Sequence, residues 1–132
     1  MKHPVRVLIV DDQVSTRQGL QALFALTPGV QVVGEAGNGR EAIELVADRH
    51  PDVVVMDVQM PVMDGLEATR QIKSKWPKVR VVALSMYAEY QQQVLAAGAD
   101  ESLLKGSPTE VLLSAVVGTR DPEDDGNSVP PP

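Results

Sequence analysis

The chain has 132 residues, a formal net charge of −6 and no cysteine. These values allow one domain with its own core and exclude disulfides and thiol chemistry. The acidic balance argues against direct nucleic-acid binding by this chain. No apolar stretch reaches the length of a membrane span and the N-terminus has no signal-peptide core, so we expect a cytoplasmic protein without membrane contact.

Much of the negative charge lies near the C-terminus. Residues 1–118 hold 14 of the 18 acidic and 11 of the 12 basic side chains and are close to neutral. From Thr119 onward the sequence is rich in Asp, Glu, Gly and Pro, a composition typical of segments without a packed core. We expect a domain over residues 1–118 and an acidic, disordered tail or interdomain linker over 119–132.

Short apolar runs alternate with segments of helical periodicity along the domain. The sequence predicts strands at about 5–10, 30–36, 53–57, 80–85 and 101–104, with a helix after each of them. The first, third and fourth runs are the most apolar, which is typical of central strands with both faces covered. This alternation predicts an α/β fold, a parallel sheet between two layers of helices.

Three helix starts are marked by capping residues. Asn38 with Glu41, and Asp64 with Glu67, have the spacing of an N-cap and an acidic residue that reaches back to it. Ser107, followed by proline and then an acidic residue, predicts a third start with Ser107 as the N-cap.

Polar residues stand at the end of four of the predicted strands. Asp11 and Asp12 follow the first strand, and Asp57 closes the third. Ser85 closes the fourth strand, and Lys105 follows the fifth. Each alone has an ordinary explanation as a cap, a turn or a solvated residue. Because the carboxyl ends of parallel strands meet at one edge, where ligands bind, their joint occurrence indicates a functional site.

The residue types at this edge suit phosphoryl chemistry. Three carboxylates repel one another unless positive charge lies among them, and their oxygens favour a hard divalent cation, which predicts Mg²⁺ held by Asp11 and Asp12. Beside such an ion, Asp57 can act as a nucleophile toward an activated phosphoryl group and form an acyl phosphate. Lys105 and Ser85 would supply charge and a hydrogen bond to the phosphoryl oxygens.

The chain resembles the receiver domain of bacterial two-component response regulators, the CheY-like fold, over about residues 5–117. The resemblance rests on the acidic pair, the lysine and the run Asp57-Val58-Gln59-Met60-Pro61-Val62-Met63-Asp64-Gly65. The segments Ser85-Met86-Tyr87 and Leu103-Leu104-Lys105-Gly106 are most similar to the NarL/LuxR-type branch. The resemblance implies a doubly wound, flavodoxin-like sheet of five parallel strands in the order 2-1-3-4-5.

The resemblance also implies roles for single residues. Asp57 is the expected phosphoacceptor and a metal ligand, Asp12 a direct Mg²⁺ ligand, and Asp11 a ligand acting through water. The backbone carbonyl of Gln59 completes the expected metal site, and the strand-end serine and lysine contact the phosphoryl group.

The family also suggests partners. A sensor histidine kinase is expected to supply the phosphoryl group, and a second copy of the chain could form a homodimer. A receiver catalyses only its own phosphorylation and dephosphorylation, so we do not expect an independent enzyme. The expected output is control of transcription through a DNA-binding domain outside this chain.

Two positions depart from the family pattern. Ser102 stands where receivers usually carry Tyr or Phe, a ring that turns inward when the serine engages the phosphoryl group. Gly106 stands where many receivers have proline, often after a cis peptide bond. The first departure predicts a reduced switch, with Tyr87 or Tyr90 as partial substitutes, and leaves phosphorylation itself intact.

Other functional classes remain open at this point. A phosphohydrolase of the haloacid-dehalogenase type also uses a strand-end aspartate and Mg²⁺, but it needs an acid where Gln59 stands. A degenerate receiver acting only through dimerisation is favoured by Ser102 and opposed by the other site residues. A single-domain regulator and a longer protein with a separate output domain both fit the sequence.

Overall fold

The computed structural model of the chain describes residues 3–118. Strands and helices alternate in this range, and the strands have the predicted bounds: β1 Val5–Val10, β2 Val30–Ala36, β3 Val53–Asp57, β4 Arg80–Ser85 and β5 Glu101–Leu104. The helices are α1 Val14–Ala25, α2 Gly39–Arg49, α3 Gly65–Lys75, α4 Glu89–Ala96 and α5 Thr109–Val117. The expected tail or linker, residues 119–132, lies outside the described range.

The sheet has the strand order β2-β1-β3-β4-β5, and all its strand pairs are parallel. The predicted α/β fold and strand order are therefore confirmed. The three most apolar strands, β1, β3 and β4, occupy the centre of the sheet. The chain runs outward from β1 to β2 and then returns to β3, which creates a switch point between β1 and β3 at the carboxyl edge, where open parallel sheets bind ligands.

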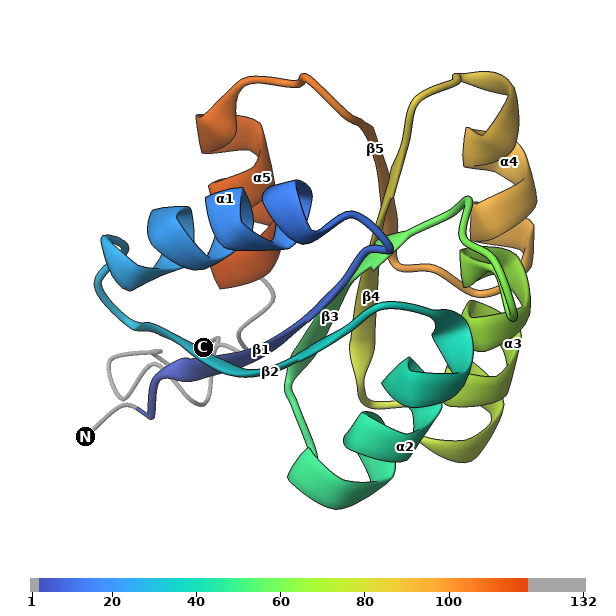
Figure 1. Ribbon diagram of the computed structural model, residues 1–132, viewed down its shortest axis with the longest axis horizontal. Coiled ribbons are helices and arrows are strands. Elements are labelled where there is room, and N and C mark those ends of the chain that lie inside the picture. Colours follow the sequence, from blue (N-terminus) through green and yellow to red (C-terminus); the bar gives the residue numbers. More distant parts are fainter. Residues whose placement is uncertain (1–2, 119–132) are drawn as a thin grey trace, which may run out of the picture.

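Two layers of helices cover the sheet. Helices α1 and α5 lie on one face, and α2, α3 and α4 on the other (Figure 1). Along β1, Val7 and Ile9 pack in the cluster with α1 and α5, whereas Leu8 and Val10 pack in the cluster with α2, α3 and α4. None of these four residues is more than 1% exposed. Strand β1 is therefore packed on both faces, which fixes the position of the acidic residues that follow it. No helix in the described range has the length and apolar character that a membrane crossing requires.

The predicted caps of α2 and α3 are confirmed. Asn38 Oδ1 accepts a hydrogen bond from the Glu41 N–H at 2.9 Å, and Asp64 Oδ1 accepts one from the Glu67 N–H at 3.0 Å. Of the two acidic residues, only Glu41 of α2 bonds to the backbone before its helix: its carboxylate accepts the N–H of Gly37 at 2.9 Å. In α3 the Glu67 carboxylate accepts bonds from side chains of its own helix instead.

The predicted cap at Ser107 is wrong. Helix α5 begins at Thr109 without a side-chain cap, and the Ser107 hydroxyl donates to the carbonyl of Leu104 at 2.7 Å. Gly106 has a φ of 89°, a left-handed conformation that glycine adopts without strain and that closes this segment into a turn. The hydroxyl is therefore used inside the turn, in a local bond that competes with capping.

At the amino ends of the strands, two aspartates bind neighbouring strands together. Asp52, just before β3, accepts the Arg6 N–H of β1 at 2.8 Å, and Asp100, just before β5, accepts the Val81 N–H of β4 at 2.9 Å. The Lys73 ammonium of α3 donates to Asp100 at 3.0 Å and to two carbonyls of the segment leading into β4. This edge of the sheet is held by side chains as well as by the backbone.

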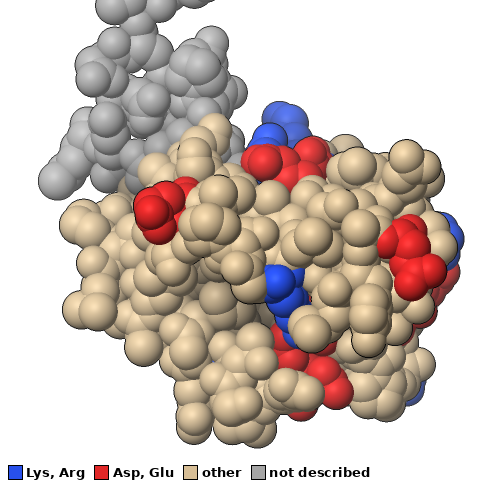
Figure 2. Space-filling model, turned by 90° about the horizontal axis from the view of Figure 1, so that it is seen from above, with Lys and Arg blue, Asp and Glu red and all other residues tan. Residues whose placement is uncertain are grey.

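Two arginines on and after α3 are paired with acidic neighbours. Arg70 lies 3.1 Å from Glu67, and Arg80 lies 2.9 Å from Glu101. On the face shown in Figure 2, the Lys and Arg side chains of the described residues occur in small groups beside Asp and Glu. A continuous basic surface of the kind that binds nucleic acid is not present among the described residues of that face.

Candidate functional site

The carboxylates singled out from the sequence meet at the carboxyl edge of the sheet. The register of β1 with β3 pairs Val10 with Met56, so that Asp11 and Asp57 follow at neighbouring positions. Together with Asp12, they place carboxylate oxygens within 4.8 Å of one another. Asp11 and Asp57 are buried, whereas Asp12 is exposed. The structure thus brings together acidic residues from two strands that are far apart in the sequence.

Lys105, the residue after β5, joins this cluster. Its ammonium lies 2.9 Å from Asp11 Oδ2 and 3.2 Å from Asp57 Oδ1. The Lys105 N–H donates to the carbonyl of Ser85 at 2.7 Å, which fixes the start of the lysine side chain against the end of β4. One ammonium faces three carboxylates, so a negative charge remains at the edge of the sheet.

Asp11 is held on several sides, unlike Asp12. Its Oδ1 accepts the Gln13 N–H at 2.9 Å, and its Oδ2 accepts from Lys105. Its backbone carbonyl accepts a hydrogen bond from Arg17 at 2.6 Å, and the same guanidinium pairs with Glu35 on β2 at 3.1 Å. Sequence reasoning missed Arg17, because nothing in the pattern of α1 distinguishes it from a solvated arginine.

The electrostatics of the cluster show incomplete compensation. Burial raises the pKa of Asp57 from 3.8 to about 6, and the negative charges of Asp11 and Asp12 add to this effect, while Lys105 counteracts it. Partial burial pushes the pKa of Lys105 down, but its hydrogen bonds to Asp11 and Asp57 and their charges outweigh burial and raise that pKa. The remaining negative charge and the all-oxygen donor set fit a hard divalent cation.

Ser85 and Gln59, the other predicted site residues, bond to the segment around α4. Ser85 is 1% exposed, and its hydroxyl donates to the carbonyl of Tyr87 at 2.9 Å. The Gln59 side chain is exposed and donates through Nε2 to the hydroxyl of Tyr90 at 3.1 Å. Both residues lie next to the acidic cluster in the chain or in the sheet, and both side chains are engaged with the β4–α4 region rather than with the carboxylates.

Comparison with known proteins identifies this arrangement. Residues 7–117 match the family model of the response regulator receiver domain. The chain belongs to the response regulator receiver family. Its acidic site fits the acceptance of a phosphoryl group, and receiver domains bind Mg²⁺ at an acidic cluster of this kind. The chain is therefore the signal-receiving domain of a two-component response regulator, as the sequence predicted.

The relatives agree with the predicted branch. The receiver is 36% identical over 117 residues to the transcriptional regulatory protein DegU of Brevibacillus brevis, an alignment that covers 87% of this chain and 50% of DegU. The chain spans about half the length of the curated relatives it matches.

Solved structures agree with the fold. The signal receiver domain of the response regulator NarL from Mycobacterium tuberculosis has a TM-score of 0.80 and 34% identity, with 88% of this chain and 98% of that chain covered. The CheX–CheY–BeF3–Mg²⁺ complex from Borrelia burgdorferi has a TM-score of 0.80 and 27% identity, with 90% of this chain and 92% of that chain covered.

Two glycines shape the receiver loop that follows Asp57. A Cβ on Gly65 would overlap the Asp57 carbonyl and lie 2.8 Å from the Val58 Cα. At the start of α2, the N–H of Gly39 donates to the carbonyl of Met63 at 2.8 Å, and a Cβ there would lie 2.7 Å from that carbonyl. Gly65 could be found from the family motif, whereas nothing in the sequence marks the close approach at Gly39.

The same loop contains a strained residue. Val62 has a φ of 73°, which is rare for a β-branched residue. The N–H of Met63 donates to the carbonyl of Pro61 at 2.9 Å, so Val62 is the central residue of a γ-turn. Its side chain is 79% exposed, and the turn sets the path of the chain between Gln59 and α3.

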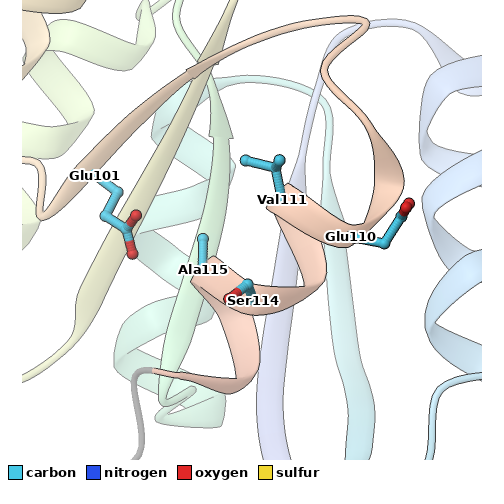
Figure 3. A pocket seen from close by; sticks show the side chains of 5 residues that line it. All are labelled: Glu101, Glu110, Val111, Ser114 and Ala115. Atoms are coloured by element: carbon cyan, nitrogen blue, oxygen red, sulfur yellow. The ribbon is translucent and has the colours of Figure 1, made fainter.

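A hollow of about 390 Å³ lies elsewhere in this receiver, between β5 and α5. Figure 3 shows that Glu101 of β5 borders it on one side and Ala115 and Ser114 of α5 on the other, with Glu110 and Val111 near the start of that helix. None of the residues of the acidic cluster lines it. The candidate site is therefore the edge of the sheet, and the hollow is a separate feature of the surface.

Proposed function

We propose that Asp57 is the residue that accepts the phosphoryl group. The observation that carries this proposal is its position: a buried carboxylate at the end of the central strand β3, 3.2 Å from the Lys105 ammonium and beside two further carboxylates. Asp11 has both oxygens engaged in hydrogen bonds, and Asp12 is exposed. Asp11 therefore lacks a carboxylate oxygen that is not already hydrogen-bonded, and Asp12 lacks the shielded position that Asp57 has.

We further propose that the metal is Mg²⁺, held by Asp12, Asp57 and the backbone carbonyl of Gln59, with Asp11 acting through water. The hydrogen bonds of both Asp11 oxygens support the indirect role of that residue, and the exposure of Asp12 supports direct ligation. The solved complex of CheY from Borrelia burgdorferi contains BeF3 and Mg²⁺. Bound Mg²⁺ would neutralise charge on the phosphoryl oxygens during transfer.

The phosphoryl donor in this proposal is a phosphohistidine of a sensor kinase. An Asp57 oxygen attacks phosphorus, and the O–P bond forms as the P–N bond breaks. The electron pair of the P–N bond stays on the imidazole nitrogen, which takes up a proton from water. Lys105 would exchange part of its pairing with Asp57 for a phosphoryl oxygen, and Ser85 would turn from the Tyr87 carbonyl to donate to another. In this view the chain catalyses only its own phosphorylation and dephosphorylation.

We assign the domain to residues 1–118 and treat 119–132 as a linker to an output domain. DegU is named a transcriptional regulatory protein, which supports control of transcription as the output. We propose that the protein acts in the cytoplasm and that the receiver itself does not bind nucleic acid. A single-domain regulator and a degenerate receiver that acts as a dimerisation or interaction module are the alternatives. The length of the complete gene product separates the first alternative from the proposal.

The test is incubation with acetyl phosphate and Mg²⁺, followed by intact mass spectrometry and peptide mapping. The wild-type protein should gain a single phosphoryl group, and Asp57→Asn should gain none. Asp48→Asn, an exposed carboxylate on α2, is the matched control and should behave like the wild type. Chelation of Mg²⁺ should prevent the reaction. Phosphorylation of Asp57→Asn would show that the site is assigned to the wrong residue.

A further inference from the structure

The loop after Asp57 is tied to α4 by one side-chain hydrogen bond. The Gln59 carboxamide donates to the Tyr90 hydroxyl at 3.1 Å. Tyr90 lies in the first turn of α4, where its ring is half-buried and packs against the core cluster on this face of the sheet. Any shift of the Gln59 loop therefore has a direct route to the start of α4.

Backbone carbonyls hold the start of α4 in place of a capping side chain. The helix has no side-chain N-cap, and its first turn is held by the carbonyl of Tyr87, which accepts both the Tyr90 N–H at 3.2 Å and the Ser85 hydroxyl at 2.9 Å. The rings of Tyr87 and Tyr90 are neighbours, with centroids 6.2 Å apart. Two separate contacts thus lead from the candidate site to α4, one from Gln59 to the Tyr90 hydroxyl and one from Ser85 to the Tyr87 carbonyl.

Position 102 does not supply a ring to this region. Ser102 pairs with Ala83 in the sheet, on the side of the sheet that α4 covers. Its hydroxyl is buried and has no hydrogen-bond partner in the described part of the chain. Its carbonyl accepts the side chain of Gln91 on α4 at 3.2 Å. The aromatic side chain that connects the site with the core on this face is therefore Tyr90, on the helix rather than on β5.

We propose that Tyr90 is a positioning residue that couples the metal site to α4 through its hydrogen bond with Gln59. Mg²⁺ binding at the aspartates, without any phosphoryl group, shifts the Gln59 loop, and Tyr90 transmits this shift to the first turn of α4. The Ser85 contact with Tyr87 forms a second route, which responds to the phosphoryl group. The inference rests on the proposed metal site, and it adds a specific carrier of the coupling.

The test is titration of the protein with Mg²⁺ alone at constant ionic strength, followed by amide NMR. In the wild type, resonances near the carboxylates (residues 11–13 and 57–59) and those of α4 should shift together. Tyr90→Phe keeps the ring and removes only the hydroxyl, so the α4 shifts should fall by roughly threefold or more while those near the carboxylates remain. Tyr87→Phe removes a hydroxyl that makes no hydrogen bond to residues 3–118, so this variant should match the wild type.

Gln59→Leu gives an independent check from the other end of the bond. It should reduce the α4 shifts as much as Tyr90→Phe does, and the double variant should lose no more than either single variant, because both remove one interaction. Undiminished α4 shifts in Tyr90→Phe, or additive losses in the double variant, would overturn the coupling while leaving the metal site in place. Absence of shifts at residues 11–13 and 57–59 in the wild type would overturn the metal site and the coupling together.

Discussion

Replacement of Asp57 by asparagine should stabilise the metal-free protein, and by an amount that grows with pH. The folded protein raises the pKa of Asp57 from 3.8 to about 6, so it binds the proton more tightly than the unfolded chain does. Ionisation therefore costs the folded state more, and stability is lost as the pH rises from about 4 to about 6. The difference of about two pKa units corresponds to about 3 kcal/mol.

The asparagine side chain has nearly the same shape and stays neutral, so it avoids this cost. In urea denaturation with a chelator present, the free energy of unfolding of Asp57→Asn should match that of the wild type at about pH 4 and exceed it by about 1–3 kcal/mol at about pH 8. Saturating Mg²⁺ should narrow this gap, because the ion binds the folded wild type more tightly than the variant.

Glu44→Gln on α2, which removes an exposed carboxylate, is the control and should show no comparable growth with pH. A wild type that is as stable as Asp57→Asn at both pH values, or more stable at high pH, would contradict the charge balance described for the site.

Three further variants test the supports of the fold. Gly65→Ala should cost about 1–3 kcal/mol in urea denaturation through overpacking against the preceding loop, and it should also slow phosphorylation by acetyl phosphate; unchanged values in both assays would count against the tight approach. Lys73→Met keeps the aliphatic stem but removes the ammonium that donates to two carbonyls and to Asp100, which keeps the Val81 N–H as its remaining donor. This variant should cost about 2 kcal/mol, whereas Lys75→Met should cost little. Ser102→Ala removes a buried hydroxyl without a partner and should raise stability by up to about 1 kcal/mol, and a clear loss would reveal a hidden bond.

The strands and the grouping of the acidic residues could be predicted from the sequence because their causes are local or follow from topology. Continuous apolar runs mark buried strands, and the parallel arrangement alone places the residues after β1 and β3 at one edge. Asn38 and Asp64 could be recognised as caps because their partners lie three residues away. The same local signal failed at Ser107, where a glycine turn uses the hydroxyl before the helix begins.

Contacts between distant segments could not be predicted in this way. Arg17 reaches the backbone of Asp11 and a carboxylate on β2, and Tyr90 reaches Gln59 from a helix much later in the chain. Gly39 approaches Met63 because α2 and the β3–α3 loop pack closely. Each depends on how the helices sit on the sheet, and a periodic pattern gives the buried face of a helix without giving its rotation to within one side chain.

The two aspartates at the amino edge of the sheet have a consequence for the site at the opposite edge. Because side chains alternate along a strand, sliding β3 by one residue against β1 would turn every side chain of β3 to the other face and carry Asp57 away from Asp11. The Asp52 carboxylate accepts the Arg6 N–H in the observed alignment, and Asp100 accepts the Val81 N–H between β5 and β4, so both bonds favour this register. The spacing of the clustered carboxylates and of Lys105 thus depends on two residues at the opposite edge of the sheet, far from the cluster itself.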